Sequence, residues 1–278
     1  MTVLVTPPSL DELPEGVLIA GGTEVVPQLG DGLLAADTLV DVSALLPCGI
    51  SGTRIGAGTT LAELEESEEV PSALREACRL AASPQLRAMG TVGGNLLQST
   101  RCWYWRLQYP CRLHRVAEGI WGDECHAREG EHREHAIFAN DFCASAHPSD
   151  VAAALLALGA TVRTNRRELP LGELYRLPDE DDRRLTTLEP GEVLLELDVP
   201  TADASVYLKA MDRKRFGFPL VGVAAARRGG HTAVALAGVA PMPWLLEGSL
   251  DAATPLPGTA YKVTVARALT SRALATIG

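Results

Sequence analysis

The stretch LIAGGTEV at Leu18–Val25 predicts a short strand, a tight turn and the start of a helix. An apolar run ends at the Gly21-Gly22 pair, and Thr23 can cap a helix that begins at Glu24. Glycines let a backbone approach a ligand closely, and the N-terminus of a helix favours a phosphate group. We therefore expect this turn to present backbone N–H groups to a diphosphate.

A second glycine pair lies in the string TVGGN at Thr91–Asn95. Each of the two pairs stands beside a hydroxyl or amide side chain that can also bind a phosphate oxygen. A single Gly-Gly pair is usually only a turn, so the presence of two pairs strengthens the prediction of a diphosphate site only moderately. The string GAGTTL at Gly56–Leu61 lacks the last glycine of the GxGxxG fingerprint, so a Rossmann site is not indicated.

Length and charge narrow the class of protein. A chain of 278 residues can form one large domain or two modest ones, and its net charge of -10 argues against a nucleic-acid partner. The first residues, MTVLVTPPSLDELPEG, contain neither a basic segment nor a long apolar core, and the apolar stretch Val151–Val162 is too short to span a bilayer. We expect a cytoplasmic protein, with export alongside a signal-bearing partner left open.

Apolar periodicity and capping residues predict the other elements of the N-terminal region. They are a strand at Thr38–Val42, a hairpin at Ile50–Gly58, and helices at Leu61–Glu66, Ala73–Ala82 and Val151–Leu158. The expected N-caps of these helices are Thr59 or Thr60, then Ser72, then Ser149 or Asp150, and Gly159 ends the last helix.

After the polar segment Asp179–Glu189 the pattern changes. Four strands are expected at Val193–Val199, Val206–Met211, Leu220–Ala226 and Ala233–Val239, followed by a helix at Tyr261–Thr276. The sequence thus predicts an α+β fold, with one domain at 1–175 and a second at 190–278. A long ordered insertion, at about 99–147, interrupts the first domain.

Four of the six cysteines lie in this insertion, at Cys102, Cys111, Cys125 and Cys143, together with His114, His126, His132, His135 and His147 in or beside it. Four thiolates suit a zinc ion or an iron–sulfur cluster, but the gaps of 8, 13 and 17 residues include no CxxC pair. Spacing alone leaves open a cluster, a zinc site, two disulfides or buried free thiols.

Other residues of these types have simpler interpretations. Cys48 and Cys78 are expected to be core thiols, and the histidines are expected to be surface or hydrogen-bonding groups. The aromatic side chains of the insertion would form a small satellite core, and they are Trp103, Tyr104, Trp105 and Trp121.

Several strings, in their order along the chain, resemble one family. They are AGGTEVVPQL at Ala20–Leu29, ASPQLRAMGTVGGNLLQSTRCWYWR at Ala82–Arg106, HAIF at His135–Phe138, HPSDVAAALLALGA at His147–Ala160, and then EVLLELDVP, YLKAMDRKRFGFPLVGVAAA, GVAPMPW and AYKVTVARALTSRAL. The chain resembles the FAD-binding (medium) subunit of the xanthine dehydrogenase and CO dehydrogenase molybdenum hydroxylase family. It looks most like the branch with a [4Fe–4S] loop, which includes bacterial aldehyde oxidoreductase and the 4-hydroxybenzoyl-CoA reductase beta subunit.

The resemblance implies a two-subdomain FAD-binding (PCMH-type) region followed by a CO dehydrogenase flavoprotein C-terminal-like domain. It implies that Asp150 meets the FAD ribose region and that Leu194 and Lys209 lie near the flavin. It also implies that Cys102, Cys111, Cys125 and Cys143 hold a [4Fe–4S] cluster. The residues implied at the FAD phosphates are Ile19, Ala20, Gly21, Gly22, Thr23, Glu24 and Val25 in the first turn and Thr91, Gly93, Gly94 and Asn95 in the second.

The family role implied for such a chain is electron transfer. FAD and the cluster would take electrons from a molybdenum-cofactor large subunit with a 2Fe–2S small subunit and pass them to a small-molecule acceptor. One alternative is a stand-alone FAD-dependent tailoring oxidoreductase on the same scaffold. A non-enzymatic alternative is a zinc-stabilised binding module.

Overall fold

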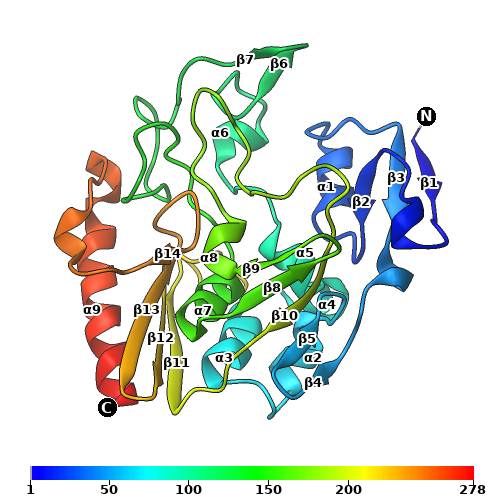
Figure 1. Cartoon of the computed structure of the whole chain (residues 1–278). Helices are drawn as coiled ribbons and strands as arrows, with labels where there is room; N and C mark the ends of the chain where they lie inside the picture. The colour runs from blue at the N-terminus through cyan, green and yellow to red at the C-terminus, as the bar shows by residue number, and fades with distance from the viewer. Residues whose placement is uncertain (1) are drawn as a thin grey trace.

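The computed structural model describes residues 2–278. At its N-terminal end, a small parallel sheet of order β1-β3-β2 forms the lobe on the right of Figure 1. Its strands are β1 (Val3–Val5), β2 (Val17–Ile19) and β3 (Thr38–Asp41), and helix α1 (Val25–Gly30) follows β2. The predicted strand, turn and helix are confirmed, but Thr23 does not cap the helix, because Glu24 occupies the N-cap position and makes no side-chain cap bond.

A five-stranded antiparallel sheet of order β4-β5-β10-β8-β9 lies at the centre of the molecule. Helices that pack near this sheet carry most of the larger hydrophobic core. The strands are β4 (Ile50–Ser51), β5 (Arg54–Gly56), β8 (Thr161–Thr164), β9 (Glu168–Pro170) and β10 (Leu194–Asp198); the helices of this region are α2 (Leu61–Glu66), α3 (Ser72–Leu80), α4 (Pro84–Met89), α5 (Val92–Leu96), α7 (Asp150–Leu158) and α8 (Leu171–Leu174).

The strand β10 belongs to this central sheet rather than to the C-terminal sheet, which differs from the predicted boundary at 175 and 190. Leu197 of β10 pairs with Ile55 of β5 on one side and with Val162 of β8 on the other. The strand runs between two earlier strands because its apolar side chains complete their core. The predicted strand itself is confirmed, and only its sheet differs.

The C-terminal region is a four-stranded antiparallel sheet, β11 (Ala204–Ala210), β12 (Val221–Arg228), β13 (His231–Ala237) and β14 (Trp244–Leu245), with helix α9 (Ala260–Ile277). Helix α9 covers one face, and α3 and α7 cover the other (Figure 1). Strand β12 alternates accordingly: Val223 faces the core with α9, and Ala224 faces the core with α7. This sheet therefore joins the C-terminal region to the N-terminal region through a continuous core.

Helix α7 is buried along almost its whole length. The Ser149 hydroxyl caps it by accepting from the Ala152 N–H at 2.9 Å, and Gly159 ends it in the left-handed conformation at φ 72°. Both features confirm the sequence prediction. Of the two other capping predictions, the one for α2 is confirmed, because Thr60 caps this helix with a full capping box. The prediction for α3 is wrong, because Pro71 is its N-cap residue and Ser72 is already inside the helix.

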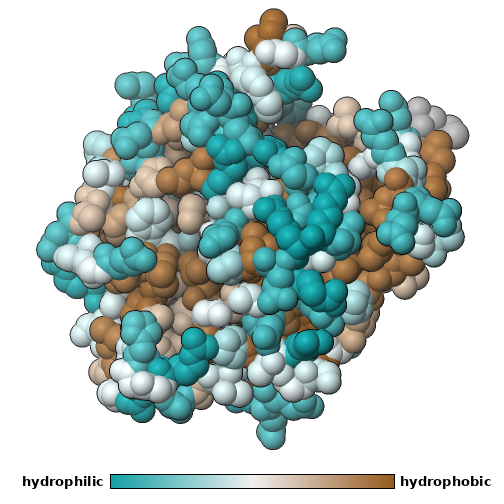
Figure 2. Space-filling view, in the orientation of Figure 1, coloured by the Kyte–Doolittle hydropathy of each residue, from teal (hydrophilic) through white to brown (hydrophobic). Residues whose placement is uncertain are grey.

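The insertion forms the top of the molecule in Figure 1 and is mostly irregular, with α6 (Trp103–Arg106) and a hairpin of β6 (Arg115–Ala117) and β7 (Ile120–Trp121). In Figure 2 this region is mostly hydrophilic, with a hydrophobic tip. The prediction that Cys48 is a core thiol is wrong, because Cys48 is exposed; Cys78 is buried as expected. No helix among residues 2–278 is both long and apolar enough to cross a membrane.

Short 3-10 turns complete the chain, at Leu10–Glu12, Ser43–Leu45, Leu250–Ala252 and Pro257–Thr259.

Candidate cofactor site

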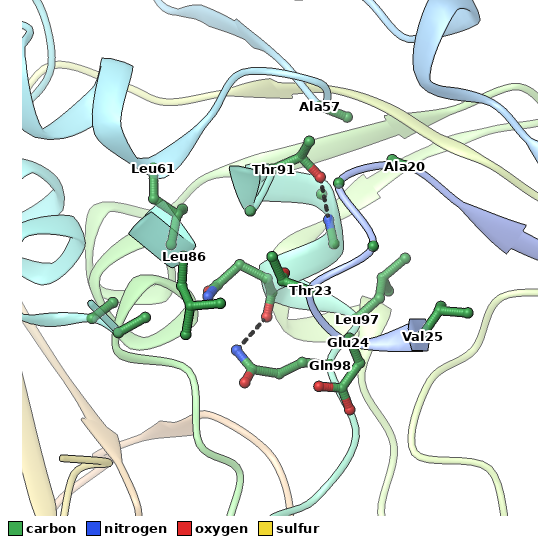
Figure 3. A pocket seen from close by; sticks show the side chains of 18 of the residues that line it. Ala20, Thr23, Glu24, Val25, Ala57, Leu61, Leu86, Thr91, Leu97 and Gln98 are labelled. Carbon is green, nitrogen blue, oxygen red and sulfur yellow. Dashed lines mark hydrogen bonds between the residues drawn. The ribbon is translucent and has the colours of Figure 1, made fainter. Parts of the chain in front are cut away.

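Both glycine pairs line one cleft of about 460 Å³, a size typical of small-molecule and cofactor sites. Figure 3 shows Ala20 and Thr23 of the first turn on the same cavity as Thr91 of the second, with Leu61 and Leu86 on its apolar side. Every residue expected at the cofactor except Lys209 lines this cleft. The first turn follows β2 and the second belongs to α5, so the cleft lies between the small N-terminal sheet and the helices of the central region.

The first turn offers a row of free amides. Among residues 2–278, no hydrogen-bond acceptor faces the backbone N–H groups of Gly21 to Val25. Gly22 has φ 72°, which few other residues adopt, and a Cβ added to Gly21 would lie 1.9 Å from the Met89 carbonyl oxygen. These N–H groups fit the oxygens of a diphosphate, because a bound anion would satisfy them.

The second turn is the first turn of helix α5. The Thr91 hydroxyl caps it by accepting from the Gly94 N–H at 3.1 Å. Gly93 packs so tightly on Ala57 that an added Cβ would lie 3.0 Å from the Ala57 Cβ. Close packing on Ala57 therefore requires glycine at position 93. The Thr91 cap stabilises the end of α5 that faces the cleft.

Asp150 begins helix α7 and lines the cleft, although its side chain is buried. Its carboxylate accepts from the Tyr207 hydroxyl and, at 2.7 Å, from the Lys209 ammonium, which also donates to the Leu80 carbonyl. Burial raises the pKa of Asp150, and Lys209 and Tyr207 act in the opposite direction. Lys209 thus lies behind Asp150 rather than in the cleft wall.

Leu194 lines the cleft from the start of strand β10. Two aromatic residues that the sequence analysis did not single out, Phe216 and Phe218, lie at the rim with about half of their surface exposed. Phe216 has φ 59°, an unusual backbone conformation for an aromatic residue. The string RFGF at Arg215–Phe218 was the available signal, because it places two aromatic residues on either side of a glycine in a segment between two predicted strands.

Glu24 joins the first turn to the start of the insertion. Its carboxylate accepts from Arg101 at 2.6 Å and from Arg106 at 2.8 Å, and also from the Gln28 amide at 2.6 Å. The Ser99 N–H donates to the same carboxylate at 3.1 Å. The two arginines therefore neutralise the one acidic side chain of the predicted phosphate turn, which no local pattern in the sequence indicated.

The four insertion cysteines line one small cavity, which Tyr104, Trp105 and Phe142 help to close. All four are free thiols, namely Cys102, Cys111, Cys125 and Cys143. No three His, Cys, Asp or Glu side chains among residues 2–278 converge closely enough to hold a single metal ion. The structure thus brings the four sulfurs around a common space, and a metal centre there stays a prediction.

Backbone N–H groups lie close to the sulfurs of Cys102 and Cys143. Burial raises the pKa of Cys102 to about 12, while hydrogen bonds from the Trp105 and Tyr104 N–H groups act to lower it. Burial also raises the pKa of Cys143 to about 12, with the Ser145 hydroxyl and N–H acting in the opposite direction. Amide donors around buried thiols are the environment that iron–sulfur ligands use.

The histidines of the insertion divide between surface and interior. His135 and His147 are buried, and burial lowers the pKa of His135 to about 4 and that of His147 to about 3. The His135 Nε2 lies 3.2 Å from the Cys102 Sγ. The expectation that the histidines are hydrogen-bonding groups is confirmed for His135, but its sulfur partner was not foreseen.

An α+β chain whose two glycine turns face one cofactor-sized cleft has the features of a nucleotide-cofactor domain. Residues 9–202 match the family model described as the FAD binding domain in molybdopterin dehydrogenase, so the chain belongs to that family. FAD is the cofactor that this family membership indicates, and the chain is an oxidoreductase component.

Two curated proteins are similar in sequence. The aldehyde oxidoreductase FAD-binding subunit PaoB of Escherichia coli (strain K12) is 34% identical over 259 residues, which cover 87% of this chain and 80% of PaoB. The nicotinate dehydrogenase FAD-subunit of Eubacterium barkeri is 33% identical over 91 residues, which cover 30% of this chain and 31% of that subunit.

Solved structures share the fold over nearly the whole chain. A reconstituted CO dehydrogenase from Oligotropha carboxidovorans aligns with a TM-score of 0.68 at 20% identity, covering 99% of this chain and 96% of that chain. Quinoline 2-oxidoreductase from Pseudomonas putida 86 aligns with a TM-score of 0.64 at 17% identity, with the same coverage of both chains. The α+β fold expected from the sequence is confirmed.

Proposed function

We propose that this chain is the FAD-binding subunit of a molybdenum hydroxylase and passes electrons from a molybdenum-cofactor partner with 2Fe–2S centres to an acceptor. FAD, when bound, supplies the chemistry that links one-electron donors to a two-electron acceptor. The observation that carries the proposal is the shared cleft: both glycine turns, Asp150 and Leu194 line it, and family membership provides the cofactor.

The chain's own residues would divide the task of binding FAD. The free N–H groups of Gly21 to Val25 would hold the diphosphate, and the Thr91-capped end of α5 would approach it from the other side. Asp150 would accept a hydrogen bond from the ribose, with Lys209 supporting the carboxylate from behind. Leu194 would contact the flavin, and the partly exposed Phe216 and Phe218 would shield it from water at the rim.

We also propose that the four insertion cysteines bind a [4Fe–4S] cluster. The sulfurs surround a cavity instead of meeting at a point, which suits ligands spaced apart by an iron–sulfur core better than ligands that all lie about 2.3 Å from one zinc ion. The aromatic side chains around the cavity and the amide donors to Cys102 and Cys143 also suit such a cluster.

The partner subunits are proposed by similarity. PaoB is by name the FAD-binding subunit of an aldehyde oxidoreductase, and one of the solved structures that share the fold is a Cu,Mo-CO dehydrogenase. A medium subunit in such an enzyme would receive electrons from a molybdenum-cofactor large subunit by way of a 2Fe–2S small subunit.

The test is the anaerobic purification of the full chain, followed by an absorption spectrum and by flavin, iron and sulfide analysis. We expect about one FAD, four iron ions and four sulfide ions per chain, which is the content of one flavin and one [4Fe–4S] cluster. A matched variant, Cys111→Ser, should lose iron and sulfide but keep FAD.

Other outcomes discriminate the alternatives. Flavin without iron or sulfide would overturn the proposed cluster but would still agree with the proposed FAD-binding subunit. Zinc without flavin would overturn both parts and support a zinc-stabilised binding module. Oxidation of a small substrate by the isolated chain, without any partner, would support a stand-alone oxidoreductase instead.

A further inference from the structure

His135 makes a contact that the proposed electron transfer does not by itself require. The residue is buried, with only 2% of its surface exposed, and its Nε2 lies 3.2 Å from the Cys102 Sγ. The Trp103 ring packs edge-on against it, with ring centroids 4.9 Å apart. The ring is therefore held against one sulfur by packing.

The direction of this hydrogen bond follows from the other ring nitrogen. In the described part of the chain, the buried His135 Nδ1 has no hydrogen-bond partner. A neutral imidazole carries one N–H, and only a proton on Nε2 gains a partner here. A Cys102 sulfur that ligates the proposed cluster carries no proton of its own, so Nε2 is then the donor and the sulfur is the acceptor.

Cys102 also differs from the other three cysteines in its position. It alone among them lines a second cavity of about 300 Å³, which shares Arg101 and Phe218 with the cofactor cleft. Arg101 is its neighbour in sequence and stacks on the Phe218 ring at 5.0 Å. Cys102 is therefore the cysteine that connects the sulfur cavity to the cofactor cleft, and it is also the cysteine that His135 contacts.

We propose that His135 donates a hydrogen bond to the cluster ligand Cys102 and thereby raises the reduction potential of the cluster. The inference rests on the proposed [4Fe–4S] site. A one-electron reduction adds negative charge that is shared with the thiolates, and an N–H donor stabilises the reduced form more than the oxidised form. His135 is a tuning residue that acts through Cys102, and it binds no substrate.

The experiment is a redox titration of the anaerobically purified full chain, followed by EPR, for the natural protein and for His135→Phe. The phenyl ring keeps the packing against Trp103 and removes the donor. At a fixed potential we expect about a tenfold lower ratio of reduced to oxidised cluster in the variant, which for one electron is about 59 mV. His135→Gln, which restores an N–H donor, should recover part of the shift.

The control is His126→Phe. His126 lines the same sulfur cavity, but its Nδ1 lies 3.2 Å from the Glu124 carboxylate and it makes no hydrogen bond to a sulfur among the described residues. The same substitution there should leave the potential unchanged. An equal shift in both variants would overturn the inference, because a general change of packing would then explain it.

Iron and sulfide analysis separates the two proposals. Four iron and four sulfide per chain with no shift in His135→Phe would overturn the role of His135 alone. Absence of iron and sulfide in the natural protein would overturn the cluster and the inference with it. If His135→Phe fails to fold, pulsed EPR of the natural protein labelled with ¹⁵N-histidine decides: coupling to a histidine nitrogen supports the bond, and no coupling rejects it.

Discussion

The Asp150 carboxylate serves both the fold and the cofactor cleft, because it pairs with the buried Lys209 and also lines the cleft. Asp150→Asn removes the partner of the buried Lys209 ammonium, and breaking a buried pair costs about 3–5 kcal/mol. We expect the unfolding free energy to fall by that amount and FAD retention to fall too, as measured by urea unfolding and by flavin released on gel filtration.

The double variant Asp150→Asn/Lys209→Met provides the control. It removes both charges, so most of the lost stability should return, while FAD retention should stay low if Asp150 contacts the ribose. Full recovery of FAD retention would show that Asp150 serves only the fold.

Gly21 gives a second prediction for a single residue. Gly21→Ala would place a Cβ 1.9 Å from the Met89 carbonyl oxygen, so the first turn and the C-terminal end of α4 must move apart. We expect a loss of about 1–3 kcal/mol, as for other overpacked sites, and weaker FAD binding. Gly30→Ala, in the same segment, meets no atom within 4 Å and should leave both quantities nearly unchanged.

Residue patterns predicted the two glycine turns, and they narrowed two caps to Thr59 or Thr60 and to Ser149 or Asp150, of which the structure uses Thr60 and Ser149. Such features depend on a few neighbours in sequence. The patterns failed for Cys48, which is exposed, since burial of a cysteine depends on which distant segment covers it. The Glu24–Arg101 pair was beyond reach for the same reason: it joins residues 77 positions apart.

At the level of elements, helix α5 depends on its cap. Thr91→Ala should cost about 1 kcal/mol of stability, since the Gly94 N–H loses its acceptor, and it should also weaken FAD binding. Thr60→Ala removes the equivalent cap of α2, whose hydroxyl is outside the cleft, and should cost a similar amount without affecting FAD. Thermal unfolding and flavin titration of the two variants check this difference.

The elements themselves were largely predictable from apolar periodicity, and the sheet that each strand joins was not. The pattern at Leu194–Asp198 is that of any buried strand, and it stands next in sequence to the four strands of the C-terminal sheet. Its pairing with Ile55 and Val162 depends on which sheet edge offers apolar neighbours to the strand. This is a property of the assembled core and cannot be read from the strand alone.

For the whole molecule, Lys262 of α9 links the C-terminal region to the insertion. Its ammonium is fully buried and donates to the Glu134 and Gly238 carbonyl oxygens. Burial lowers its pKa to about 7, and the Glu134 carboxylate opposes that change; the neighbouring His135 ring faces the same region.

Stability should therefore depend on pH through Lys262. Between about pH 7 and pH 10.5 the unfolded chain holds a proton on this amine that the folded chain has released, so the unfolding free energy increases as pH rises through that window. Urea unfolding at several pH values should show this increase in the natural protein and a smaller one in Lys262→Met. Parallel pH curves for the two proteins would contradict the prediction.

The insertion leaves the FAD-binding region after α5 and returns just before α7, and the Ser149 hydroxyl donates to the Asn95 side-chain oxygen at 2.6 Å across that point. Its exit and entry are thus neighbours, and a short connection between them would keep both helices in position. The path of the chain would therefore allow a much shorter loop at this point, and what ties the insertion to its host is packing, since Ile137 and Phe138 lie in the core beneath α9.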